Sequence, residues 1–157
     1  MVPSTSSVVR DADAMRTLAA DVAQGCRAGD VIVLSGPLGA GKTTFTQGFA
    51  AGLRVAGVVT SPTFAIARVH QSTVGGPDLV HVDAYRLGGL AELDDLDLDA
   101  SLAESVTVVE WGEGLAETLA AEVVTVRIER DGNGPHMGDA SSDARRVTVT
   151  WPSGRGG

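Results

Sequence analysis

The run of residues with the clearest chemical meaning extends from Gly36 to Thr44 and reads Gly-Pro-Leu-Gly-Ala-Gly-Lys-Thr-Thr. It fits the pattern Gly-x-x-x-x-Gly-Lys-Ser/Thr of a phosphate-binding loop, or P-loop. Glycines permit the positive φ angles that turn backbone N–H groups toward phosphate oxygens, and a following helix adds its positive N-terminal end. The lysine supplies a point charge for the β- and γ-phosphates. We therefore predict that this run cradles a purine nucleoside triphosphate.

Each position of this loop has an expected role. Phosphate contacts are predicted for Gly36, Leu38, Gly39, Ala40, Gly41, Lys42, Thr43 and Thr44. The Thr43 hydroxyl can also ligate Mg²⁺, and Thr44 is expected on the side of the α-phosphate. The alternative interpretation is a glycine-rich turn that binds nothing. Lys42 is the sole lysine among the 12 Lys and Arg residues of the chain, which favours the binding loop.

Two other runs, Leu79 to Asp83 and Val106 to Glu110, place a carboxylate directly after mostly apolar residues. Such runs are typical of buried strands. A P-loop needs an acid that holds Mg²⁺, usually at the end of a buried strand. Either Asp83 or Glu110 alone could be an ordinary strand-end residue, but two such acids in one small P-loop domain favour a magnesium role for at least one of them. The expected tasks are metal coordination, often through water, and orientation of the attacking water. The sequence does not divide these two tasks between the two residues.

Three further features allow both a functional and a structural interpretation. The hydroxyl-rich run from Thr60 to Thr63 could sense a γ-phosphate or form a Ser-Pro turn. Arg86 could contact phosphate or make a surface ion pair. Trp111 could stack on a base or on a partner, or pack in the core. A nucleotide site makes the functional interpretation worth testing for all three.

The pattern of apolar residues predicts the elements that position these groups. Strands are expected over 8–10, 31–34, 58–59, 64–70, 79–83, 106–110, 123–130 and 146–151, and helices over 11–28, 42–53 and 114–121, with one or two short acidic helices over 90–102. Asp11 is the expected cap of the first helix, and Cys26 is expected on its apolar face as a buried structural thiol. His70 and His81 alternate with apolar strand residues and are interpreted as structural. This order predicts an α/β sheet with antiparallel additions.

Length and composition restrict the protein further. The 157 residues suit a single domain over 1–151, with a mobile surface loop over 131–144 and a disordered tail over 152–157. A net charge of −8 disfavours direct binding of nucleic acid or of anionic membranes. No apolar run approaches the about 20 residues of a membrane-spanning helix, and no secretory signal opens the chain. We expect a cytoplasmic protein without a membrane partner.

The single lysine also narrows the class of P-loop protein. A GTPase needs an Asn/Thr-Lys-x-Asp segment to recognise guanine, and Lys42 cannot serve in two motifs. An ABC ATPase needs a Leu-Ser-Gly-Gly-Gln-like signature, which the sequence lacks. Two classes stay open beside a partner-dependent ATPase: a small-molecule kinase, and an interaction module that nucleotide binding gates.

The combined motifs resemble those of the bacterial tRNA threonylcarbamoyladenosine biosynthesis ATPases, the TsaE (YjeE) family. The matching segments are the P-loop, Ser61-Pro62-Thr63-Phe64, His81-Val82-Asp83-Ala84-Tyr85-Arg86-Leu87, Glu92-Leu93 and Glu110-Trp111. They cover about residues 8 to 130. Pro37 and Gly112 depart from the usual acidic residue and proline of the family, and the loop 131–144 resembles an insertion.

This resemblance implies a three-layer, P-loop NTPase-like fold with a mixed, mainly parallel sheet and antiparallel edge strands. It implies binding of ATP/ADP with Mg²⁺ and weak or partner-dependent ATP hydrolysis. The activity would support threonylcarbamoyladenosine (t6A37) modification of tRNA in complex with TsaD and TsaB, without transferring the group, and tRNA would be contacted only indirectly. It also implies catalytic roles for Asp83, Glu110 and the switch residue Thr63, metal binding by Thr43, Asp83 and Glu110, and nucleotide contacts by Arg86 and Trp111. The acidic stretch Glu92 to Asp99 could dock a partner or be a solvated helix face.

Overall fold

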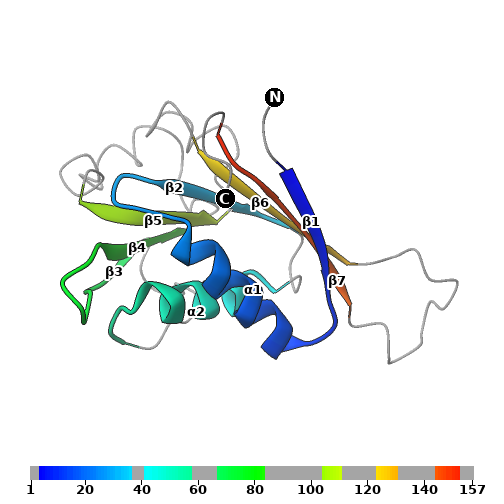
Figure 1. The fold of residues 1–157 in the computed structure, drawn as a ribbon, viewed down its shortest axis with the longest axis horizontal. Coiled ribbons are helices and arrows are strands. Elements are labelled where there is room, and N and C mark those ends of the chain that lie inside the picture. The colour runs from blue at the N-terminus through cyan, green and yellow to red at the C-terminus, as the bar shows by residue number, and fades with distance from the viewer. Residues whose placement is uncertain are drawn as a thin grey trace, which may run out of the picture.

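The computed structural model describes residues 4–36, 41–57, 67–83, 104–110, 123–130 and 144–152. Their elements are β1 (Ser4–Val9), α1 (Ala12–Gln24), β2 (Val31–Ser35), α2 (Lys42–Leu53), β3 (Ala67–His70), β4 (Asp78–Asp83), β5 (Ser105–Glu110), β6 (Val124–Arg130) and β7 (Arg145–Thr150) (Figure 1). The strands form one seven-stranded sheet in the order β1-β7-β6-β2-β5-β4-β3.

The centre of the sheet is parallel and its edges are antiparallel. Strands β6, β2, β5 and β4 run parallel to one another. On one side β7 pairs antiparallel with β6 and with β1, and on the other side β3 pairs antiparallel with β4. The predicted P-loop NTPase-like α/β fold, with a mixed sheet and antiparallel edge strands, is confirmed. The predicted antiparallel additions to the sheet include the pairing of the last two strands, β6 and β7.

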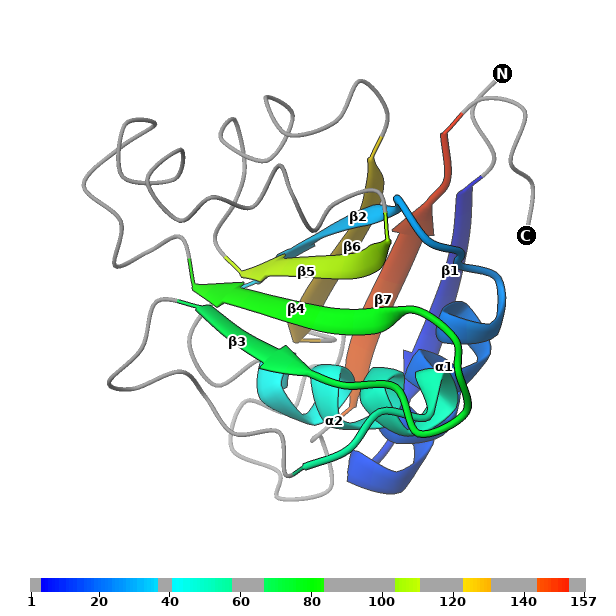
Figure 2. The ribbon, with the colours of Figure 1, turned by 90° about the vertical axis from the view of Figure 1, so that its left-hand side faces the viewer.

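Helices α1 and α2 lie side by side on one face of the sheet (Figures 1 and 2). Two glycines of α2 permit this close approach. A Cβ atom built on Gly48 would lie 2.4 Å from the Arg16 backbone, and one on Gly52 would lie 2.7 Å from Ala20 Cα. Because such contacts are closer than real atoms allow, side chains at these two positions would push the helices apart.

The core between the helices and the sheet is built from aliphatic strand residues and two phenylalanines of α2. Phe45 and Phe49 stack with ring centroids 6.2 Å apart and are fully buried. The opposite face of the central strands is also buried, as Val33 and Val109 show. The strand beginning at Val31 is therefore buried on both faces, in keeping with its continuous apolar run. None of the helices in the described ranges is long and apolar enough to cross a membrane.

The first helix is shorter than the sequence predicts. It begins after Asp11, as expected, since the Asp11 carboxylate accepts a 2.8 Å hydrogen bond from Ala14 N–H. It ends at Gln24 rather than near residue 28, because the Gly25 N–H turns back to the carbonyls of Val22 and Ala23. Cys26 therefore follows the helix instead of lying on its face, and it packs against the core only half-buried.

The first strand is longer than the sequence predicts. Residues 4 to 9 all pair with β7, although a strand was expected only over 8–10. Backbone pairing holds this polar, exposed segment at the edge of the sheet, with little burial of its side chains. The expected strand over 58–59, the start of the strand over 64–70, the helices over 90–102 and 114–121, nearly all of the loop over 131–144 and most of the tail lie outside the described residues.

Candidate functional site

The predicted phosphate loop connects the end of a buried strand to the start of a helix. Strand β2 ends at Ser35, Gly36 follows it, and α2 begins at Lys42. Gly41 caps the helix with a φ of 111°, a left-handed conformation that favours glycine. The strand-before, helix-after context that the motif requires is therefore confirmed. Leu38, Gly39 and Ala40 lie outside the described residues.

Lys42 reaches across the loop to its first residue. Its Nζ donates a 2.7 Å hydrogen bond to the Gly36 carbonyl oxygen, and the side chain is only 6% exposed. The two following threonines, Thr43 and Thr44, are half-buried in the first turn of α2. The N-terminal end of a helix, a lysine and two hydroxyls thus occur together beside the loop, which is the chemistry that a phosphate anion requires.

One row of the sheet brings the two predicted acids to the level of this loop. Glu110 lies in register between Leu34 of β2 and Asp83 of β4. Since β2, β4 and β5 are parallel, their carboxyl ends meet at one edge of the sheet. The loop starts two residues beyond Leu34, at the same edge. For Asp83, the structure places the backbone at this edge, and the side chain is outside the description.

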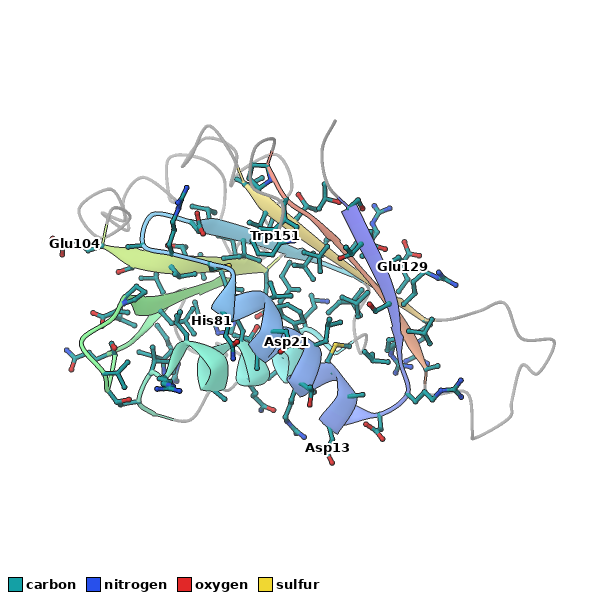
Figure 3. The ribbon with its side chains drawn as sticks, in the orientation of Figure 1. Asp13, Asp21, His81, Glu104, Glu129 and Trp151 are labelled. Atoms are coloured by element: carbon teal, nitrogen blue, oxygen red, sulfur yellow. The ribbon has the colours of Figure 1, made fainter. Side chains whose placement is uncertain are left out.

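Glu110 has a partner that sequence reasoning missed. His81 Nε2 lies 2.7 Å from Glu110 Oε2, and the side chains of His81 and Glu110 are 0% and 7% exposed. His81 is on the helix side of the sheet (Figure 3). Its register partner is Val108, two residues before Glu110, so the two side chains share a face. The alternation of residues within each strand indicates which face His81 and Glu110 occupy. Their contact also requires that β4 pair with β5, which only the order of strands in the sheet shows.

The surroundings of His81 define its tautomer. Among the described residues, the buried Nδ1 atom has no hydrogen-bond partner. A buried N–H without an acceptor costs more than a bare ring nitrogen, because the donor loses its bond to water. The favoured tautomer carries a hydrogen on Nε2, which donates a hydrogen bond to the Glu110 carboxylate. The interpretation of His81 as a structural residue overlooked this contact.

The other predicted positions are divided between described and undescribed parts of the chain. Thr63, Arg86 and Trp111 lie outside the described residues. His70 accords with its structural interpretation, because its Nδ1 is 3.1 Å from the carbonyl oxygen of Ala56 in the turn beside β3.

The potential metal ligands suit a hard cation. Thr43 offers a hydroxyl, and Asp83 and Glu110 offer carboxylates, which are the oxygen donors that Mg²⁺ prefers. The register row places both acids at the edge where the loop begins. Within the described ranges, no group of three or more His, Cys, Asp and Glu side chains could hold a metal ion by itself, so further ligands would have to be water or phosphate oxygens. The residues present therefore fit Mg²⁺ that arrives with a nucleotide.

Fold and site together define a P-loop NTPase-like α/β protein. A family model described as "Threonylcarbamoyl adenosine biosynthesis protein TsaE" matches residues 9–137. The chain belongs to the TsaE family, whose members take part in the biosynthesis of t6A in tRNA.

Relatives from several bacteria support this assignment. The chain is 58% identical to the tRNA threonylcarbamoyladenosine biosynthesis protein TsaE of Streptomyces coelicolor, over 87% of this chain and 89% of the relative. It is 46% identical to TsaE of Mycobacterium tuberculosis, over 94% and 86%. The crystal structure of Bacillus subtilis YdiB superposes with a TM-score of 0.75 at 32% identity, covering 99% of this chain and 90% of that one.

Proposed function

We propose that this chain binds ATP with Mg²⁺ and hydrolyses it to support t6A modification of tRNA, in complex with TsaD and TsaB and without transferring the group itself. The observation that carries the proposal is that Leu34, Glu110 and Asp83 are in register across three parallel strands. They lie at the edge of the sheet where the loop that contains Lys42 begins. Membership of the TsaE family supplies the pathway. The net charge of −8 supports indirect contact with tRNA through partner proteins.

The proposed division of labour follows from the donor types. Backbone N–H groups from Gly36 to Thr44 and the Lys42 ammonium bind the phosphates, and Thr43, Asp83 and Glu110 hold the metal. When bound, Mg²⁺ offsets negative charge that develops on the phosphate oxygens. Glu110 orients the attacking water and accepts its proton, because a carboxylate can act as a general base within hydrogen-bond reach.

The segments outside the described residues complete the proposal. Thr63 responds to the γ-phosphate as a switch residue. Arg86 contacts phosphate as a charge-assisted donor, and Trp111 stacks on the nucleotide. These three assignments come from the motifs Ser-Pro-Thr-Phe, His-x-Asp-x-Tyr-Arg and Glu-Trp at their positions in this sequence.

The decisive experiment measures t6A formation on tRNA under multiple-turnover conditions. The reaction contains the host's TsaD and TsaB and the enzyme that forms threonylcarbamoyl-adenylate, with and without this chain. We expect product formation to stop early without the chain and to continue with it, accompanied by ATP hydrolysis to ADP. If the chain leaves the amount of product unchanged, the proposal is wrong. If product continues while no ADP forms, the chain acts as a nucleotide-gated module rather than an ATPase.

A further inference from the structure

The pair formed by His81 and Glu110 is unusual for its burial. Both side chains are almost fully buried, and their atoms Nε2 and Oε2 are 2.7 Å apart. A buried carboxylate is costly unless hydrogen bonds compensate for the lost water. His81 is its hydrogen-bond partner among the described residues. The contact therefore has a large influence on where the Glu110 side chain rests.

We propose that His81 is a positioning residue, which holds Glu110 through an Nε2–H···Oε2 hydrogen bond in the orientation that hydrolysis requires. This inference rests on the proposed function for its catalytic consequence, whereas the hydrogen bond itself does not.

The geometry restricts the carboxylate in a useful way. A glutamate side chain has three rotatable bonds, and one fixed oxygen removes most of that freedom. With Oε2 held by His81, Oε1 is the oxygen that makes no hydrogen bond to another described residue. A single oxygen in a defined place is what alignment of a water molecule needs. His81 also lies on β4, two residues before Asp83. The strand that carries Asp83 therefore also carries the residue that holds Glu110.

His81 has no competing task in the described part of the chain. Its Nδ1 is buried without a partner, and the ring lies against the apolar core of the helix face. If His81 served packing alone, a phenylalanine of similar size would fill the space and avoid the orphaned nitrogen. The polar ring is instead explained by the carboxylate that it contacts.

The test compares two substitutions that separate volume from hydrogen bonding. His81→Phe keeps a ring but removes the donor, whereas His81→Gln keeps an N–H donor at a similar distance from the backbone. With the partner proteins present, we expect His81→Phe to lower kcat for ATP hydrolysis about tenfold or more, with little change in KM for ATP. We expect His81→Gln to recover most of that loss. The matched control is His70→Phe, a buried histidine on β3 that contacts Ala56 instead of an acid.

A second measurement reads the hydrogen bond without activity. The chain has three histidines, so two-dimensional ¹H–¹⁵N NMR with His70→Phe and His81→Gln as assignment aids can identify the His81 ring. We expect the Nε2–H tautomer, and a changed Nε2 shift in Glu110→Gln. This measurement tests the hydrogen bond between His81 and Glu110 even if His81→Phe fails to fold.

The outcomes distinguish this inference from the proposed function. An Nδ1–H tautomer, or equal kcat for His81→Phe and wild type, would overturn the positioning role. Equal losses in His81→Phe, His81→Gln and the His70 control would show a general packing effect and overturn it as well. If wild type hydrolyses no ATP with its partners, the proposed function fails and the positioning role in hydrolysis fails with it, while the NMR arm still reports whether the hydrogen bond exists.

Discussion

The Lys42 ammonium and the Gly36 carbonyl oxygen, 2.7 Å apart, connect the two ends of the phosphate loop. This contact holds a buried cation next to the N-terminal end of α2, where the helix dipole already favours an anion. The Lys42 ammonium and the N-terminal end of the helix both carry positive potential, and both favour a bound anion. The loop is thus arranged to gain from binding an anion such as a phosphate group.

Lys42→Ala should weaken ATP binding at least about tenfold, which corresponds to about 1.4 kcal/mol. The melting temperature should change by only a few degrees, since a lysine at a helix N-terminus does not stabilise the helix. Isothermal titration calorimetry measures the affinity. The control is Arg127→Ala, which removes an exposed cation from β6 that is paired with Glu129 at 3.6 Å. Equal affinity of Lys42→Ala and wild type would contradict the role of the loop.

Thr43→Val should make the protein more dependent on magnesium, because it replaces a ligand hydroxyl with a methyl group of similar size. We expect the Mg²⁺ concentration for half-maximal ATP hydrolysis to rise about tenfold, while binding of ATP in the presence of EDTA stays unchanged. Thr17→Val is the matched control. Its hydroxyl also lies on a helix, where it donates to the Asp13 carbonyl oxygen at 3.0 Å. If both variants need the same Mg²⁺ as wild type, Thr43 is not a ligand.

Gly48→Ala should destabilise the fold, although alanine is the better helix former by about 1 kcal/mol. The added Cβ would stand 2.4 Å from the Arg16 backbone, so α1 and α2 must separate. Overpacking of this kind costs about 1–3 kcal/mol, which predicts a melting temperature lower by about 3 °C or more. Gly76→Ala is the control, because its nearest neighbour is the Ser72 hydroxyl at 3.6 Å. A melting temperature at or above wild type for Gly48→Ala would contradict the close helix contact.

The sequence predicts features that depend on neighbouring residues and misses those that depend on distant ones. The strand from Val31, the helix from Lys42 and the β6–β7 hairpin follow from local patterns, and the structure confirms them. The end of α1 is not predicted, because Cys26 follows Val22 by four residues and continues the helical spacing past Gln24. The packing of Gly25 against Trp151, where an added Cβ would lie 3.0 Å from the ring, is a contact between residues far apart in the sequence.

The candidate site shows the same division. The residue types of the loop and the two acids are visible in the sequence. Their common edge depends on β5 lying between β2 and β4, which a pattern of single strands cannot give. The contact between His81 and Glu110 needs that order together with the register. His81 therefore looked like an ordinary strand residue until the sheet was known.

Asp11→Ala should remove the cap of α1 and lower the stability of the domain. The Asp11 carboxylate accepts a 2.8 Å hydrogen bond from the Ala14 N–H, and the Asp11 backbone has the extended conformation of an N-cap. Loss of such a cap costs about 1 kcal/mol, which corresponds to a melting temperature lower by roughly 2–4 °C. Thermal melts followed by circular dichroism measure this change.

Two further variants separate the cap from its charge. Asp11→Asn keeps a capping oxygen and should melt near wild type, since asparagine caps as well as aspartate. Asp21→Ala removes an exposed carboxylate from the last turn of the same helix (Figure 3), where it does not cap the helix, and should not lower the melting temperature. If Asp11→Asn melts as low as Asp11→Ala, the effect comes from charge near the helix dipole rather than from the hydrogen bond. Helix α1 packs directly on α2, which begins at the phosphate loop. We expect Asp11→Ala to bind ATP with wild-type affinity as long as the domain is folded, so binding should be measured well below the melting temperature.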